Sequence, residues 1–385
     1  MLEIHLKIAL SEPNICGNEW SYIENCLKTG WVSSAGSYVN QFEDAIKNFV
    51  GSRYGIATVN GTAALHVSMV AAGISSQDAV LLPTLTFVAT ANTIKYCGAE
   101  PIFMDCYRDN LCLDIEKLKN FLNQETIQKK DGFTYHKKTA KRISAIMPVH
   151  VYGQCVDMEA LVSLCEYYRI KIIEDAAESL GSFYKNKHTG TFGLAGCFSF
   201  NGNKIITSGS GGMVVTNDEQ FAARVRHLTT QAKTKPTMCE HDAIGFNYRM
   251  SNMHAALGLG QMENLNKFLE IKRKNALFYK KHLSDLDIPL LWEKPNTKSN
   301  FWFYIIRVPK KHKNKLINCL LSNHIHVQSV WKPLHQLPMY QTSYAYHIES
   351  AHEVYETSLC LPCSTSLQYE DIDHVCKIIK KYFKK

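Results

Sequence analysis

Apolar and polar positions alternate along the chain in a way that predicts strands and helices in turn. Between residues 54 and 216, short apolar runs of strand length are separated mostly by stretches in which apolar residues recur at helical spacing. This alternation favours an α/β fold with a mainly parallel sheet and helices on both faces, because each parallel connection needs a crossover segment. The seven predicted strands are 54–60, 79–82, 101–105, 143–150, 170–175, 197–200 and 212–216.

The segments on either side of this region have different patterns. Residues 13–50 predict two helical stretches that are interrupted by a glycine-bounded loop at 30–36. The basic stretch 123–142 interrupts the strand and helix alternation, and it predicts a surface insertion. Beyond the last predicted strand, a long helical stretch at about 255–283 leads to three further apolar runs and a closing helix from Tyr369. These three runs are 301–308, 326–333 and 358–362.

This order of segments predicts two domains in a chain of 385 residues. We expect a large α/β domain with an N-terminal arm over 1–254. A bridging helix and a small C-terminal domain are expected over 255–385.

Composition excludes several classes of protein. The formal net charge is +8, but the basic residues fall in separate runs that indicate solvated faces, so we expect no nucleic-acid partner. No apolar run approaches the length of a membrane span, and the N-terminus does not resemble a signal peptide, so we expect a cytoplasmic protein without membrane insertion. The thirteen cysteines are scattered, with one C-x-x-C pair at Cys360 and Cys363, so we expect no metal site.

Lys204 stands in an unusual setting for a lysine. It comes shortly after the predicted strand 197–200 and lies among small residues. A lysine placed where backbone segments must approach closely is a candidate Schiff-base amine. Pyridoxal phosphate supplies the matching carbonyl, and it needs a carboxylate for its ring nitrogen, a cradle for its phosphate and a flat apolar surface. The glycines around the lysine are Gly202, Gly209, Gly211 and Gly212.

The chain offers candidates for all three needs. Asp175, at the end of a predicted strand, can keep the pyridine nitrogen protonated. The segment N-G-T-A-A-L-H (60–66) predicts a tight turn and a helix start, whose free N–H groups suit a phosphate. Ser199 can add a hydroxyl, and Phe87 can stack on the ring. Taken singly, these residues have ordinary explanations as a turn, a helix cap or core, but their combination favours a lysine-anchored cofactor.

Six motifs in order resemble one known family, the DegT/DnrJ/EryC1/StrS nucleotide-sugar aminotransferases. The resemblance runs from about residue 13 to the C-terminus. It implies the type I fold of pyridoxal phosphate enzymes, with seven strands in this region and the cofactor bound covalently to Lys204. The motifs are G-W-V-S-S-A-G (30–36), N-G-T-A-A-L-H (60–66), P-V-H-V-Y-G (148–153), E-D-A-A-E-S-L-G (174–181), F-S-F-N-G-N-K (198–204) and G-F-N-Y-R-M-S-N (245–252).

The resemblance also implies roles for individual residues. Lys204 and Asp175 would be catalytic, and Glu178 would lie near the phenolic oxygen of the cofactor ring. Asn247 would reach the cofactor phosphate of a partner subunit, so we expect a homodimer with shared active sites. The residues expected to bind the cofactor are Gly61, Thr62, Ala63, Phe87, Asp175, Glu178, Ser199, Lys204 and Asn247.

Five further residues are candidates for substrate contact. Two lie in the loop 30–36, which lines the sugar site in the resembled family; the alternative is a simple helix connector with an inward tryptophan. His150 ends a predicted strand on the side of the acids, although a lone histidine is more often structural. The roles of Trp331 and Lys332 stay open. The five candidates are Trp31, Ser33, His150, Arg249 and His335.

The activity that the resemblance implies is amino transfer from L-glutamate to a ketone of a nucleotide-linked sugar in surface-glycan synthesis. The motifs are most similar to the branch that aminates C4 of UDP-linked 4-keto-6-deoxy-N-acetylhexosamines, and a dTDP-4-keto-6-deoxyhexose is the alternative acceptor. Two other classes on this scaffold stay open: a sugar dehydratase, which carries histidine in place of the lysine, and a non-enzymatic regulatory protein. A nicotinamide enzyme is disfavoured because no G-x-G-x-x-G follows the first strand.

Overall fold

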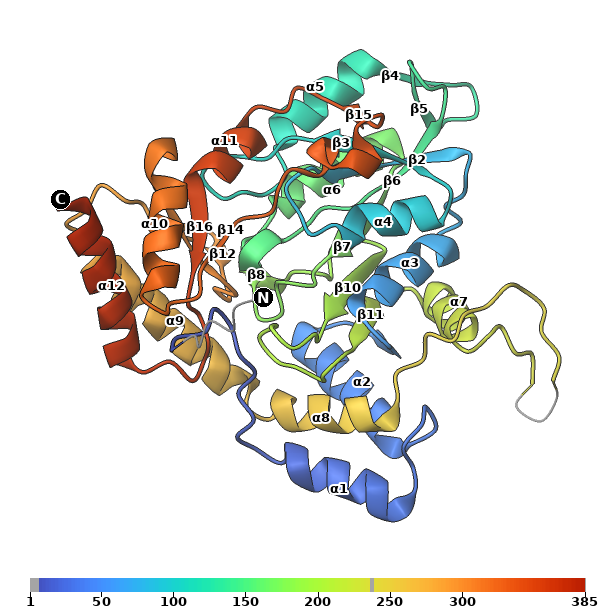
Figure 1. Cartoon of the computed structure of the whole chain (residues 1–385). Helices are drawn as coiled ribbons and strands as arrows, with labels where there is room; N and C mark the ends of the chain where they lie inside the picture. The colour runs from blue at the N-terminus through green and yellow to red at the C-terminus, as the bar shows by residue number, and fades with distance from the viewer. Residues whose placement is uncertain (1–6, 236–238, 385) are drawn as a thin grey trace.

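A central, largely parallel sheet organises the computed structural model, which describes residues 7–235 and 239–384 (Figure 1). The main strands are β1 (Tyr54–Thr58), β2 (Asp78–Pro83), β3 (Glu100–Met104), β6 (Arg142–Ile146), β7 (Lys171–Asp175), β10 (Ala195–Ser199), β11 (Gly212–Thr216) and β15 (Tyr344–Ala345). Their spatial order is β1-β11-β10-β7-β6-β2-β3-β15. Neighbours from β10 to β15 are parallel, whereas β11 is antiparallel to both β1 and β10. The seven predicted strands are all present, so the prediction of a mainly parallel sheet is confirmed.

Helices cover both faces of this sheet (Figure 1). In chain order they are α1 (Glu19–Thr29), α2 (Ser37–Val50), α3 (Gly61–Ala71), α4 (Ala89–Tyr96), α5 (Ile115–Glu125), α6 (Met158–Tyr168), α7 (Glu219–Thr229), α8 (Asn252–Met262), α9 (Leu265–His282), α10 (Lys310–Ser322), α11 (Ser350–Thr357) and α12 (Tyr369–Phe383). One apolar core includes residues of α3, α4 and α7, and the other includes residues of α2, α5 and α6. Because both faces are covered, the strands are apolar almost throughout.

The basic stretch 123–142 forms a hairpin that is joined to the sheet. Its strands are β4 (Thr126–Gln128) and β5 (Thr134–His136), and Tyr135 of β5 pairs with Arg142 at the start of β6. The predicted surface insertion is therefore a hairpin attached at the start of β6, a strand that lies between β7 and β2 inside the sheet. A second small sheet, β12-β8-β9, consists of β8 (Phe183–Tyr184), β9 (Lys187–His188) and β12 (Thr297–Lys298).

The predicted long helix at 255–283 is two helices, α8 and α9. The chain turns tightly between them, where the amide of Asn264 donates to the carbonyl of Gln261. Asparagine favours such turns over helix interiors, and the break redirects α9 toward the C-terminal sheet. That sheet has the order β13-β16-β14, and its strands fall within the three predicted apolar runs. The strands are β13 (Tyr304–Arg307), β14 (Gln328–Ser329) and β16 (Ser358–Leu361).

The division at residue 254 stays a prediction, and two segments of the C-terminal part pack on the large sheet. β15 pairs with β3 in parallel, and a short 3₁₀ helix, η2 (Leu334–Gln336), lies beside Thr84 at the end of β2. A second, η3 (Pro338–Tyr340), packs its tyrosine against Phe103 of β3. The two parts of the chain are therefore interleaved.

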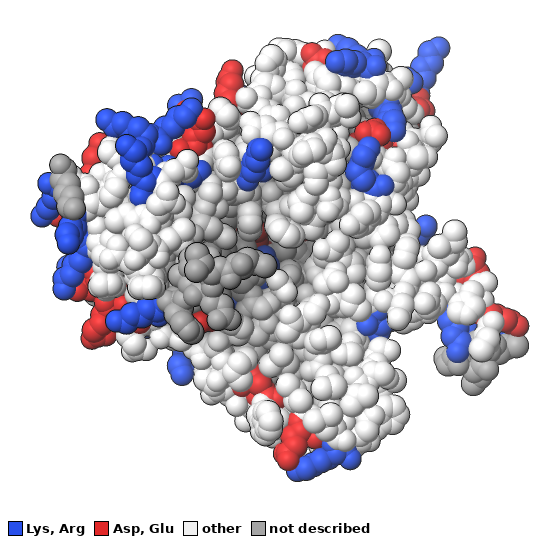
Figure 2. All heavy atoms as spheres, in the orientation of Figure 1, with Lys and Arg blue, Asp and Glu red and all other residues white. Residues whose placement is uncertain are grey.

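Charged side chains on the surface are mixed in sign. Figure 2 shows Lys and Arg over α10 and α12 and around the β4–β5 hairpin, with Asp and Glu among them. Several of these lysines are paired, as Lys310 is with Glu356 and Lys380 with Asp285. Within residues 7–235 and 239–384, no helix has the length and apolar character needed to cross a membrane. All thirteen cysteines are free thiols.

One buried carboxylate, Asp105, fastens α11 to the end of β3. It accepts hydrogen bonds of 2.9 to 3.0 Å from three successive amides at the start of that helix and one of 2.7 Å from Lys117. Burial alone would raise the pKa of Asp105, but these hydrogen bonds lower it below its usual value. The three amide donors belong to Glu349, Ser350 and Ala351.

Asp105→Asn should destabilise the fold by about 3 kcal/mol, because several charge-assisted hydrogen bonds are lost inside the protein. The folded pKa of Asp105 is lowered, so its contribution is complete above the unfolded-state value of about 4 and is lost as pH falls through the folded value. The variant should therefore lose less stability on acidification than the wild type. Urea unfolding at neutral and acidic pH measures both effects. Asp109→Asn, which removes only a surface pair with Lys294, is the control.

Candidate active site

A cavity of about 370 Å³ opens at the carboxyl ends of the parallel strands, where α/β sheets place their ligands. Asp175 ends β7 and Ser199 ends β10, and the following loops carry Glu178 and Lys204 into the same cavity. The cavity gathers residues that lie more than 140 positions apart in the sequence. The predicted site residues in its lining are Gly61, Thr62, Phe87, Asp175, Glu178, Ser199 and Lys204.

Asp175 is a buried carboxylate with defined partners. Its Oδ2 accepts a hydrogen bond of 2.7 Å from the hydroxyl of Thr90, and its Oδ1 accepts one of 3.2 Å from the amide of Ala177. Burial raises the pKa of Asp175, and these two hydrogen bonds and the charge of Lys204 oppose the rise. The carboxylate is thus held in place by protein groups while it still faces the cavity.

The first turn of α3 presents unpaired amides to the cavity. The side chain of Asn60 caps the helix by accepting a hydrogen bond of 2.8 Å from the amide of Ala63. Ala64 donates to the carbonyl of Asn60, so the amides of Gly61 and Thr62 have no acceptor within the helix. They lie at the positive end of the helix dipole, beside Ser199. This arrangement suits an anion such as a phosphate.

The space around Gly61 admits no residue larger than glycine. A Cβ atom at this position would lie 2.8 Å from the Cβ of Ser199, closer than two such atoms approach. Any larger residue would push the start of α3 away from the end of β10 and would open the cradle.

Lys204 lies between an indole ring and a carboxylate. Its Nζ is 3.8 Å from the centre of the Trp302 ring and 3.9 Å from Oε1 of Glu178. Only 13% of its side chain is exposed. Burial lowers the pKa of Lys204, while Glu178 and Asp175 act in the opposite direction. The amine is therefore a stronger candidate for a nucleophile or a base near neutral pH than a surface lysine.

Glu178 has a strongly perturbed carboxyl group. Its Oε2 accepts a hydrogen bond of 2.7 Å from the amide of Tyr152. Burial raises the pKa of Glu178 to about 7, against the opposing effects of Lys204 and of the Tyr152 amide. A carboxyl group that titrates near neutral pH beside a buried amine is a recurrent feature of active sites.

Aromatic rings form one wall of the cavity. Tyr152 is stacked between Trp302, with ring centres 6.1 Å apart, and Trp331, with ring centres 5.7 Å apart. The ring of Phe87 is tilted by 59° to that of Trp331, with ring centres 5.5 Å apart. Phe87 is half exposed, as expected of a ring that can stack on a flat ligand.

Thr90, Tyr152 and Trp302 were not predicted from the sequence. Tyr152 belongs to a motif that carried the family resemblance, but it was given no role. Trp302 was placed inside a predicted strand at 301–308, whereas β13 begins at Tyr304 and leaves the indole free to face the cavity. Its position next to other aromatic residues was the available signal.

Some predicted residues are not brought into the cavity of this chain. The amide of Ala63 is used by the Asn60 cap. His150 is fully buried: its Nε2 pairs with Glu174 at 2.9 Å, and its Nδ1 accepts from the amide of Val156. Both ring nitrogens thus have structural partners, which is the ordinary state of a buried histidine.

Two further candidates are likewise held by partners outside the cavity lining. Arg249 forms a buried ion pair with Glu43. The Nδ1 of His335 lies 2.8 Å from the hydroxyl of Thr84, and burial lowers the pKa of His335. These contacts explain both residues as parts of the framework.

Three predicted residues lie on the surface. The carbonyls of Trp31 and Ser33 accept hydrogen bonds from Asn252, and their side chains are exposed. This loop between α1 and α2 was predicted correctly as an interruption of the helices. Asn247 is exposed and pairs through its backbone with Thr230.

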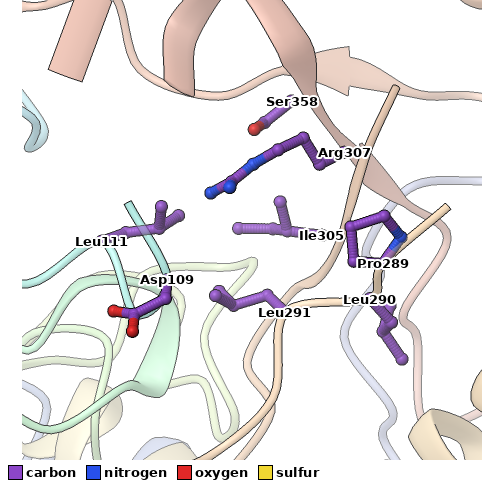
Figure 3. Close-up of a pocket in the computed structure, with 8 residues that line it drawn as sticks. All are labelled: Asp109, Leu111, Pro289, Leu290, Leu291, Ile305, Arg307 and Ser358. Carbon is purple, nitrogen blue, oxygen red and sulfur yellow. The ribbon is translucent and has the colours of Figure 1, made fainter. Parts of the chain in front are cut away.

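A second cavity, of about 150 Å³, carries no comparable chemistry (Figure 3). Its walls are mainly leucine, isoleucine and proline side chains. Arg307 donates to the carbonyl of Arg108, and Asp109 is paired with Lys294. Its lining contains no lysine or histidine beside an acid, so the larger cavity is the candidate active site.

Comparison with known families agrees with this geometry. The profile of the DegT/DnrJ/EryC1/StrS aminotransferase family matches residues 13–380. The chain belongs to this family. GDP-perosamine synthase of Escherichia coli O157:H7 is 36% identical to it over 377 residues, which cover 98% of each chain. GDP-perosamine synthase of Vibrio cholerae is 34% identical and covers 98% of this chain and 99% of its own.

A solved structure of another aminotransferase has the same fold. Helicobacter pylori PseC, an aminotransferase involved in the biosynthesis of pseudoaminic acid, superposes with a TM-score of 0.87 and 26% identity. The superposition covers 98% of this chain and 99% of PseC. The protein is therefore a sugar aminotransferase that acts on nucleotide sugars, and aminotransferases of the DegT/DnrJ/EryC1/StrS family use pyridoxal phosphate bound covalently through a lysine.

The residues of the cavity fit this cofactor. The unpaired amides at the start of α3 and the hydroxyl of Ser199 suit its phosphate, and Asp175 suits its ring nitrogen. One buried polar atom of the lining, Oδ1 of Asn203, has no hydrogen-bond partner among the residues that the structure describes. Buried polar groups rarely remain unpaired, so this atom indicates a polar ligand.

Thr90→Val should weaken the binding of pyridoxal phosphate about tenfold, because one hydrogen bond to the Asp175 carboxylate is lost at nearly constant shape. The pKa of Asp175 should rise further, since that hydrogen bond lowers it. Titration of the cofactor-free protein with pyridoxal phosphate, followed by visible absorbance, gives the affinity. Thr93→Val is the matched control, because the Thr93 hydroxyl bonds, among the described residues, only to the Thr90 carbonyl. Equal affinities in both variants would contradict the role of Thr90.

Proposed function

We propose that the protein transfers an amino group from L-glutamate to the C4 keto carbon of a nucleotide-linked 4-keto-6-deoxy sugar. The observation that carries this proposal is a largely buried amine, Lys204, in one cavity with two buried carboxylates, Asp175 and Glu178. A helix start with open amides lies in the same cavity. This is the set of groups that pyridoxal phosphate chemistry requires from a protein.

Each group has a separate task. When bound, pyridoxal phosphate takes up the amino group of the donor and gives it to the acceptor. Asp175, which Thr90 helps to keep ionised, holds the ring nitrogen protonated. Gly61, Thr62 and Ser199 hold the phosphate, and Phe87 covers the ring. Lys204 binds the cofactor and, once its amine is free, moves the proton that leaves the α-carbon of glutamate.

Glu178 is placed to serve the amine of Lys204. The two groups are 3.9 Å apart in a buried environment, and the pKa of Glu178 is raised to about 7 by burial. At neutral pH, Glu178 can therefore exist with or without a proton. It can balance the charge of Lys204 as the amine gains and loses its own proton.

Lys204 also separates this proposal from the two alternatives on the same scaffold. The resembled dehydratases carry histidine at the corresponding position. A regulatory protein would need no buried amine with two acids beside it, and keeping these groups buried costs stability.

Two observations bear on the nucleotide of the acceptor, and they favour different nucleotides. The motifs around Lys204 and in the loop 30–36 resemble enzymes for UDP-linked 4-keto-6-deoxy-N-acetylhexosamines. Three relatives that are 34 to 36% identical are GDP-perosamine synthases, and they favour a GDP-linked acceptor. Lys204 is the only cation in the described lining of the cavity, so we expect further cations for the diphosphate from residues outside it.

A homodimer with shared sites is part of the proposal. Large apolar side chains are exposed around the loop 30–36 and before Asn247, with Trp31 58% exposed and Ile244 88% exposed. Large apolar residues that are exposed in this way are typical of a protein interface. In such a dimer, Asn247 of one subunit would reach the cofactor phosphate of the other subunit, as the family resemblance implies.

Addition of L-glutamate should convert the visible spectrum of the cofactor-loaded protein to that of the aminated cofactor. Lys204→Ala should lose the lysine-linked absorbance and slow the conversion by about 10³-fold or more, because both the covalent link and the base are removed. Stopped-flow absorbance measures both. An unchanged spectrum after glutamate addition to the wild type would exclude glutamate as donor.

The acceptor can then be identified with the aminated enzyme. GDP-, UDP- and dTDP-linked 4-keto-6-deoxy sugars should differ in kcat/KM by about 10²-fold or more, because polar groups that recognise one base are left unpaired by another. Recovery of the lysine-linked absorbance gives the rate for each sugar. Equal rates for all three would show that the base is not recognised.

Two inactive variants should restore activity when they are mixed and allowed to exchange subunits. Lys204→Ala and Asn247→Ala would damage the same composite site from opposite subunits, so a mixed dimer contains one intact site. About a quarter of the sites should then be active at equal mixing. A mixture that stays as inactive as its components, although mass spectrometry shows mixed dimers, would place Asn247 in its own chain's site.

A further inference from the structure

The environment of the Lys204 amine contains one group that the proposed roles do not use. Trp302 is 1% exposed, and the centre of its ring lies 3.8 Å from Nζ of Lys204. The carboxylate oxygen of Glu178 lies at almost the same distance, 3.9 Å. The amine therefore has an acid and an electron-rich aromatic face as its neighbours, and both attract an ammonium.

Both the side chain and the backbone of Trp302 form hydrogen bonds. Its indole N–H donates to the carbonyl of Asn203, 2.7 Å away and one residue before Lys204. Its backbone amide donates to Oδ1 of Asn300 at 2.9 Å, and its carbonyl accepts from the buried amine of Lys272 at 2.9 Å. The ring therefore cannot turn away from the lysine without breaking the indole hydrogen bond to Asn203.

Two residues beside the Trp302 ring have a strained backbone conformation. Phe301, next to Trp302, has φ +51°, and Tyr152, which stacks on the Trp302 ring, has φ +54°. Aromatic residues rarely adopt this left-handed conformation, which persists where surrounding contacts impose it. The side chain of Asn300 supplies such contacts, because it also donates to the carbonyls of Glu178 and Leu180.

We infer that Trp302 is a positioning residue that holds the Lys204 amine, in its protonated form, beside Glu178. The inference deepens the proposed function and rests on the role of Lys204 stated there. Burial disfavours a charged amine, yet Lys204 must carry a proton for a time after taking it from the substrate. The indole face stabilises the amine in that form and keeps it pointed into the cavity.

The charged groups that face Lys204 are Glu178 and Asp175, and both stay in place when only Trp302 is changed. Trp302→Leu should therefore lower the pKa of Lys204 by about one pH unit, the effect of one desolvated cation–π contact. Trp302→Phe, with a weaker aromatic face, should lower it by less.

The pKa of Lys204 can be measured without turnover. The full chain, freed of pyridoxal phosphate, is exposed briefly to an amine-modifying reagent at graded pH, and mass spectrometry gives the modified fraction of the Lys204 peptide. Glu178→Gln is the positive control, because loss of the facing carboxylate should also lower the midpoint. Trp292→Leu is the matched negative control, since it removes a similar contact of 3.9 Å, with Lys280, away from the cavity.

Fluorinated tryptophan at position 302 tests the proposal if the leucine variant does not fold. Fluorine withdraws electron density from the ring face at nearly constant shape, so the Lys204 midpoint should fall stepwise with fluorine content. A midpoint that does not move, or that moves equally with Trp292→Leu, would overturn the inference. If the midpoint is constant while glutamate still converts the cofactor, only this inference fails. If Lys204→Ala still undergoes that conversion at the wild-type rate, the proposed function fails instead.

Discussion

The parallel pairing of β7 with β10 is the constraint on which the cavity depends. In its register Cys197 lies beside Asp175, so both strands end on the same side of the sheet. The loops that follow them carry Glu178 and Lys204, which are 26 positions apart in the chain and 3.9 Å apart in space. Because the strands are buried except at Lys171 and Ser199, a shift of register by one residue would move every side chain to the opposite face. The acids and the amine are therefore kept together by the core rather than by their own attraction.

Keeping these groups buried is unfavourable, and much of the surrounding structure offsets that cost. Asp175 is bound by Thr90 of α4, and Glu178 by the amide of Tyr152. The neighbouring acid of β7, Glu174, accepts hydrogen bonds from three amides of the loop 190–193 and from the ring of His150. His150 thus keeps Glu174 satisfied, while Asp175 remains turned to the cavity. A histidine at the end of a strand among acids can serve the framework and never touch a ligand.

The sheet and the cofactor-facing residues could be predicted because their signals are local. Each strand is a short apolar run, the α3 start is an N-G-T turn, and Lys204 lies in a glycine-rich segment. The aromatic wall could not be predicted in the same way. Trp302 reaches Lys204 from 98 positions away through the strained loop before β13. Thr90, in α4, reaches Asp175 at the end of β7. Such contacts depend on tertiary packing, which the spacing of residues along the chain does not encode.

The same distinction explains why the candidates for substrate contact were not brought together. Arg249 and His335 belong to segments with aromatic or basic character, but each is already bonded to a framework partner, Glu43 or Thr84. The described lining has one cation, while a nucleotide sugar carries two phosphates. Charged phosphates need charged or hydrogen-bonding partners when they leave water. The exposed apolar surface around Trp31 is therefore consistent with a site that one chain begins and a second chain completes.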